Sequence, residues 1–274
     1  MARRPTVPLL VALCCAMALG ITGLLALASP AAHERDAAML HGFMGLDRPR
    51  VHGLIETLAS LADPLPYAAI GLVLVGMAVV QRRAWRAAAV VALLVATGAS
   101  THLVKQLSAH PRLETWLPVE QMGQPRWPSG HATAAMTLAL CAVLVAPHAL
   151  RAVTALAGGL FAAGVGYSVL VLAWHYPSDV LGGFLMAALW TALAVAGLRV
   201  VEGGTAAERG GVPWGPQIAL WAAAGVAGLG AAVVVAASRE GAALYAAERP
   251  TLVVGAVAIA AVAAAFAAGL ARAA

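Results

Sequence analysis

Residues 8–28 read PLLVALCCAMALGITGLLALA, a run without a single charged side chain. A helix of about 20 apolar residues is long enough to cross the hydrocarbon core of a bilayer. The whole chain has the same character, since 62% of its 274 residues are hydrophobic and only 11% are charged. Soluble domains carry about 25% charged residues. The sequence therefore predicts an integral membrane protein, and it argues against a cytosolic enzyme, a disordered chain and a nucleic-acid-binding protein.

Further apolar runs follow along the chain and predict an all-α, polytopic membrane helix bundle. Together with the first run, the predicted spans are 8–28, 65–80, 87–104, 131–149, 152–174, 179–198, 215–237 and 251–271. The last of them is rich in alanine and is expected to be a plain lipid-facing helix.

Two segments near the N-terminus allow alternative interpretations. The first run follows two arginines and ends in small residues, as a signal peptide does, but it exceeds the usual 7–15 apolar residues of one. We therefore favour an uncleaved anchor. Residues 33–63 mix charged and apolar side chains, which is typical either of a helix lying at the membrane interface or of an ordinary polar loop.

Loop charges indicate the orientation, because Lys and Arg concentrate on cytoplasmic loops. With both termini inside, the inner loops carry a slight excess of basic residues. That excess grows if Lys105, Arg112 and Arg126, which fall on outer loops, belong to a site. We therefore expect both termini in the cytoplasm.

Three polar segments at the ends of predicted spans face the outer side under this topology. They are KQLSAHPR (105–112), RWPSGH (126–131) and HYPSD (175–179). Lys105 is the only lysine of the chain, and it is either a snorkelling cation or a phosphate ligand. A turn at Pro111 would bring Arg112 and Lys105 around one anion.

The second segment has the composition of a helix start that binds an anion. Ser129 either caps the helix or contacts the anion, and Gly130 lets a ligand approach the free amides of the first turn. His131 lies in that turn, where a phosphate would favour its protonated form.

In the third segment, His175 and Asp179 are four residues apart, which puts them on one face if the turn is helical. A carboxylate on one ring nitrogen fixes the tautomer and leaves the other nitrogen to act as a nucleophile. The alternative is that Asp179 only complements the helix dipole. His131, His175 and Asp179 could also form a two-histidine, one-carboxylate metal site, but nearby cations would repel a metal ion and suit an anionic substrate instead.

Taken in order, these segments resemble the motifs of the type 2 phosphatidic acid phosphatase (lipid phosphate phosphatase) superfamily, which includes the vanadium haloperoxidases. The matching patterns are Lys105-x6-Arg112, Pro128-Ser129-Gly130-His131 and His175-x3-Asp179. The resemblance implies a six-helix core over residues 1–198. Residues 199–274 are then a cytoplasmic linker and two additional C-terminal transmembrane helices.

The resemblance also implies a metal-independent lipid phosphate phosphatase with a phosphohistidine intermediate and no cofactor. His175, oriented by Asp179, attacks phosphorus, and His131 protonates the leaving oxygen. The other motif residues bind the phosphate: Lys105, Arg112, Ser129 and Gly130.

Two positions depart from the family pattern. Leu113 replaces a proline, and Val169 replaces a phosphate-binding arginine that follows the matching Ser168. Hydrogen bonds to charged groups contribute about 1.5–3 kcal/mol, so this loss lowers activity unless another cation compensates. Arg126, three residues before Ser129, is the candidate substitute.

The expected partners are membrane lipids and a lipid phosphate substrate at the outer surface of the cell membrane. Polyprenyl pyrophosphate, phosphatidic acid and phosphatidylglycerol phosphate fit the sequence equally, and the oligomeric state does not follow from it. The competing hypothesis is an impaired family member that binds lipid phosphates or has a structural role. A transporter is disfavoured, because the titratable groups gather at one face rather than at the bilayer midplane.

Overall fold

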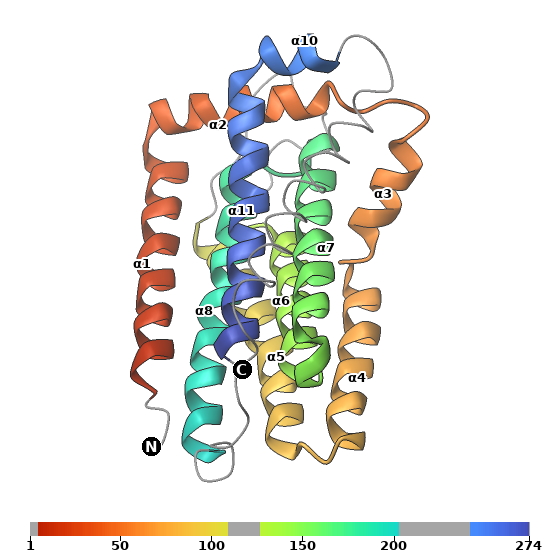
Figure 1. The fold of residues 1–274 in the computed structure, drawn as a ribbon. Helices are drawn as coiled ribbons and strands as arrows, with labels where there is room; N and C mark the ends of the chain where they lie inside the picture. The colour runs from red at the N-terminus through yellow and green to blue at the C-terminus, as the bar shows by residue number, and fades with distance from the viewer. Residues whose placement is uncertain (1–4, 109–126, 203–241, 274) are drawn as a thin grey trace.

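The protein is a bundle of long helices, seen in a computed structural model that describes residues 5–108, 127–202 and 242–273 (Figure 1). Every regular element in these ranges is helical, which confirms the predicted all-α fold. The α-helices are α1 (Thr6–Ala28), α2 (Pro30–Met44), α3 (His52–Ser60), α4 (Pro64–Val80), α5 (Ala84–Leu107), α6 (Gly130–Val145), α7 (Arg151–Val171), α8 (Pro177–Val201), α10 (Ala242–Ala247) and α11 (Pro250–Ala273), with a 3₁₀ turn at His148–Leu150.

Each predicted span inside the described ranges coincides with a helix, and the predicted span at 215–237 lies outside those ranges. Helices α1, α5, α7, α8 and α11 are long and apolar enough to cross a membrane. Helices α3 and α4 form one further candidate span that is bent by 55°. The prediction was wrong about the length of the fourth span, because 131–149 was expected and α6 ends at Val145.

Helix α6 is short because it lies at the centre of the bundle. With 16 residues it is about 24 Å long at 1.5 Å per residue. It contacts α4, α5, α7, α8 and α11, and most of its side chains are buried. Protein rather than lipid surrounds α6, so its length does not have to match the bilayer. It stops at Ala146, whose extended backbone suits a residue that precedes proline.

Arginines satisfy the carbonyl groups at the ends of two helices, on the side of the bundle opposite the start of α6. Helix ends leave unpaired carbonyls that attract cations. The donors and acceptors are Arg86 to Leu144 (2.9 Å), Arg83 to Val145 (3.5 Å), Arg151 to Ala146 (3.4 Å) and Arg199 to Ala273 (3.1 Å). These are arginines that the orientation argument places on the inner face.

The outer helices join the bundle in two places. Helix α1 packs along α8, and α11 packs on α7. Helix α11 is not a plain lipid-facing helix, since residues such as Ile259 and Ala263 are fully buried in the shared hydrophobic core. The Arg199–Ala273 contact puts the C-terminal ends of α8 and α11 at the same end of the bundle. Helices α8 and α11 therefore run in the same direction through the bundle (Figure 1).

Residues 33–63 are largely helical, which favours the interfacial helix over the polar loop. Helix α2 lies across the upper end of the bundle in Figure 1. It buries Leu40 and Phe43 against the core and exposes Glu34 and Arg35. An amphipathic helix in this position is typical of a segment in the membrane interface.

Helix α8 approaches the backbone of α6 closely at Gly183. A Cβ atom at this position would lie 2.7 Å from the carbonyl oxygen of Ser129 and 2.8 Å from the amide nitrogen of Thr133. Both are backbone atoms at the start of α6, so neither can move away without shifting the helix. Gly183 therefore sets the distance between α6 and α8.

Replacing this glycine tests the packing. We expect Gly183→Ala to destabilise the protein by about 1–3 kcal/mol, as overpacked sites do, and to lower the thermal unfolding midpoint in detergent by several degrees. Gly197→Ala is the matched control in the same helix, because a Cβ there meets no atom of the described residues within 4 Å. Equal midpoints for the two variants would contradict this account of the helix contact.

Candidate active site

The start of α6 carries the Pro-Ser-Gly-His segment. Ser129 has an extended backbone, and its side-chain oxygen accepts a hydrogen bond from the amide of Ala132 over 3.3 Å. The side chain thus caps α6, which is one of the two roles expected for it, and the residue is fully buried. A helix start with a small residue at Gly130 exposes backbone N–H groups that attract an anion.

The end of α5 brings a cation to this helix start. A Cβ atom added at Gly130 would lie 3.6 Å from Nζ of Lys105, which is in the last turn of α5. The hydroxyl of Ser108 also donates a hydrogen bond to the carbonyl oxygen of Trp127 over 3.1 Å. The first two polar segments, distant in sequence, therefore meet at one point.

A tight turn after α7 directs the third segment toward the same point. Ala173 has a left-handed backbone with φ of 57°. The amides of Ala173 and Trp174 donate to the carbonyls of Leu170 (3.0 Å) and Val169 (2.9 Å). This is the Schellman pattern that ends a helix and reverses the chain, and it usually has glycine at the left-handed position. Alanine tolerates that conformation at a cost of about 1–2 kcal/mol.

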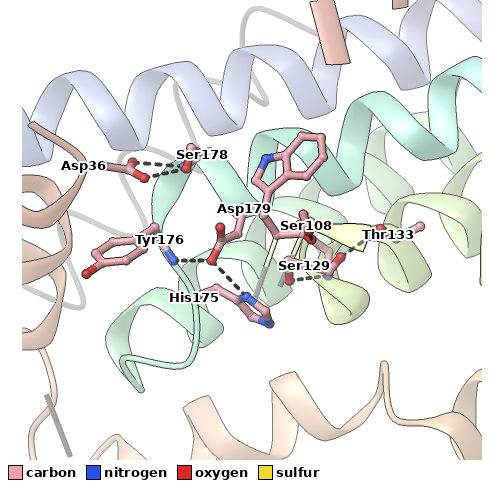
Figure 2. Close-up of polar contacts among 10 residues, drawn as sticks. Asp36, Ser108, Ser129, Thr133, His175, Tyr176, Ser178 and Asp179 are labelled. Atoms are coloured by element: carbon pink, nitrogen blue, oxygen red, sulfur yellow. Dashed lines mark hydrogen bonds and ion pairs between the residues drawn. The ribbon is translucent and has the colours of Figure 1, made fainter. Parts of the chain in front are cut away.

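His175 and Asp179 form a buried pair just after this turn (Figure 2). Nδ1 of His175 lies 3.1 Å from Oδ2 of Asp179, and each side chain is only 5% exposed. The same carboxylate oxygen accepts the backbone N–H of Tyr176 over 2.8 Å. Asp179 thus fixes the imidazole through Nδ1, and Nε2 lies on the opposite side of the ring.

The backbone of Asp179 also joins α8 to α6. Its carbonyl oxygen accepts a hydrogen bond from the amide of Ser129 over 2.9 Å. As a result, the ring centroid of His131 lies 6.4 Å from that of His175 and 5.2 Å from that of Trp174. The structure therefore brings Lys105, the start of α6 and both histidines together.

Two acidic contacts of this region were missed by sequence reasoning. Nε2 of His131 lies 3.0 Å from Oδ1 of Asp63, at the start of α4. In α2, the carboxylate of Asp36 accepts hydrogen bonds from the amide of Ser178, over 3.0 Å, and from its hydroxyl (Figure 2). Both acids lie far from their partners in sequence, so no local motif indicates them.

Some predicted positions contribute differently or cannot be placed. Arg112 and Arg126 lie outside the described residues. Val169, where the family pattern has arginine, is fully buried, and its carbonyl oxygen accepts the amide of His175 over 3.2 Å. An apolar side chain therefore occupies the position of the family's cation, next to the backbone of His175.

The two histidines have separate carboxylate partners, so they do not form one ligand set with Asp179. Within residues 5–108, 127–202 and 242–273, no three His, Cys, Asp or Glu side chains lie close enough to hold a metal ion. Two imidazoles beside an ammonium group and a helix N-terminus are instead suited to binding an anion and to transferring protons on and off it.

Comparison with known proteins links this geometry to a family. Residues 83–200, which span α5 to α8, match the sequence profile of the PAP2 superfamily. The chain is similar in fold to the crystal structure of the first transmembrane PAP2 type phosphatidylglycerolphosphate phosphatase from Bacillus subtilis, with a TM-score of 0.59 and 18% sequence identity. This match covers 72% of the present chain and 98% of the other. No curated protein sequence matches significantly.

Proposed function

Because residues 83–200 match the PAP2 superfamily, we propose that this multi-pass membrane protein is a phosphatase that hydrolyses a lipid phosphate or pyrophosphate. The observation that carries the proposal is the buried pair of His175 and Asp179 beside Lys105 and the start of α6. A histidine oriented by a carboxylate is a nucleophile, and the ammonium group and helix amides attract the phosphate that it attacks.

In the proposed mechanism, Nε2 of His175 attacks phosphorus while the bond from phosphorus to the lipid oxygen breaks. His131 gives a proton to that oxygen, which leaves as an alcohol or as the shortened phosphate. Water then attacks the phosphohistidine, releases inorganic phosphate and restores His175. Asp179 keeps Nδ1 protonated, so Nε2 carries the lone pair for attack.

The phosphoryl oxygens are bound by cations and helix-start groups in this proposal. Lys105 and the amide of Gly130 hold one side, and Ser129 contributes its hydroxyl when substrate is bound. Arg112 and Arg126 complete the set as further cations. Such groups act by stabilising the charge that develops in the transition state, and the route requires neither a metal nor a cofactor.

The candidate substrates are polyprenyl pyrophosphate, phosphatidic acid and phosphatidylglycerol phosphate. The last receives support from the Bacillus subtilis protein of the same fold, whose name gives that activity. The candidate site lies at the start of α6, and arginines bind the carbonyls at the opposite end of the same helix. Because basic residues favour the cytoplasmic side, we place the site on the extracytoplasmic face.

Phosphate release from a panel of these lipids by the purified protein tests the proposal directly. We expect release from at least one of the three substrates, at the same rate with and without a chelator. Loss of activity on chelation would favour a metal-dependent reaction. Binding of the lipids without any release would favour the alternative function, a lipid-phosphate-binding family member that lost turnover with the arginine at position 169.

Removing the proposed nucleophile is the sharpest test of the mechanism. We expect His175→Ala to reduce phosphate release to the background rate, because no other imidazole replaces it. His102→Ala is the matched control, since His102 is exposed on α5 and contacts Gln106 rather than the site. Full activity of the His175 variant would overturn the assignment.

The replacement for the missing family arginine is tested at Arg126. We expect Arg126→Ala to lower kcat/KM by about one to two decades, which corresponds to one hydrogen bond to a charged group at about 1.5–3 kcal/mol. Measurement with the best substrate of the panel is sufficient. An unchanged kcat/KM would show that Arg126 does not replace the family arginine, and that Lys105 and Arg112 are enough to bind the phosphate.

A further inference from the structure

Asp63 immediately precedes α4, but its side chain does not cap the helix. Aspartate at a helix start normally accepts the amide of the second or third helical residue. Here the sequence continues Pro64-Leu65-Pro66, and proline has no backbone N–H. Among the described residues, Asp63 makes no capping hydrogen bond to α4. The third helical residue, Pro66, therefore offers no amide, and the carboxylate does not bind that of Leu65 either, so it can serve another partner.

That partner is His131, on a different helix. Oδ1 of Asp63 lies 3.0 Å from Nε2 of His131. The backbone of Asp63 is fixed, since its carbonyl oxygen accepts the amide of Tyr67 over 2.9 Å. The hydroxyl of Tyr67 in turn donates to the carbonyl of Leu94 in α5 over 3.1 Å. Helix α4 is therefore held against α5 at the level where the carboxylate reaches the start of α6.

From this geometry we propose that Asp63 is a positioning residue for the proton donor of the reaction, an inference that rests on the proposed function. The carboxylate accepts Nε2–H of His131 and orients the ring for its role as proton donor. Nδ1–H is then the proton that passes to the leaving oxygen as the bond from phosphorus to that oxygen breaks. The product is a neutral ring that still donates Nε2–H to Asp63.

The partial exposure of Asp63 and His131 is consistent with a proton donor that is recharged in every cycle. The side chain of Asp63 is 46% exposed and that of His131 is 25% exposed. A proton donor must recover its proton from water in every cycle, and a partly exposed pair can do so. The carboxylate does not touch phosphate in this scheme, so it acts on the cleavage step and not on substrate binding.

The test compares two substrates that differ in their need for a proton. Phosphatidic acid expels an alkoxide, which must be protonated as it leaves, whereas p-nitrophenyl phosphate expels a stable phenolate. General acid catalysis contributes about 10²–10⁴-fold, and Asp63→Asn removes the charge but keeps the size of the side chain. We expect its kcat/KM to fall about 10- to 100-fold for phosphatidic acid and by less than about 3-fold for p-nitrophenyl phosphate.

The chain offers a matched control. Nδ1 of His52 lies 3.0 Å from Oδ1 of Asp47, in an exposed pair that takes no part in the site. Asp47→Asn should leave both rates unchanged. His131→Ala should reproduce the selective loss seen at Asp63, and combining the two substitutions should add little.

The ratio of the two rates separates a positioning role from a structural one. A variant that folds poorly loses both activities in proportion, so its ratio stays that of the wild type. An unchanged ratio in Asp63→Asn, with the wild type active on both esters, would overturn this inference and leave the proposed function standing. A wild-type protein that releases phosphate neither from p-nitrophenyl phosphate nor from any of the three candidate lipids would overturn both.

Discussion

The hydrogen bond from the amide of Ser129 to the carbonyl of Asp179 joins the starts of α6 and α8, and the rest of the site depends on it. Gly183 makes the contact possible, because any side chain there would meet the backbone of α6. His131 follows Ser129 closely, and His175 is held by the side chain of Asp179. The separation of the two imidazoles is thus set by backbone packing and not by flexible side chains.

Polar groups in a membrane protein must find partners within the protein, because lipid offers none. Helix α6 solves this at both ends. Arginines from neighbouring elements bind the carbonyls at its C-terminal end, and Ser129 caps its start. The start of α8 has an equivalent partner in Asp36 of α2. Helix α2 therefore helps to fix the helix that carries Asp179.

Local patterns in the sequence predicted those features that depend on neighbouring residues. The apolar runs predicted the helices with their approximate bounds. The prediction that His175 and Asp179 pair was right, but the helical spacing assumed for it was wrong, because α8 begins only at Pro177 and His175 lies in the segment after the turn that ends α7. The short α6 was not predictable, since its length reflects burial among other helices. Asp63 shows the limit most clearly, because nothing in the neighbouring sequence indicates its partner and only the fold brings His131 to it.

The two histidines have the same kind of partner in different surroundings, and the difference matches what each must do. His175 and Asp179 are each 5% exposed, so water competes little for the hydrogen bond that orients the proposed nucleophile. His131 and Asp63 are 25% and 46% exposed, so protons can return from solvent between turnovers. In the proposed mechanism, one fold thus places the nucleophile and the proton donor with their ring centroids 6.4 Å apart.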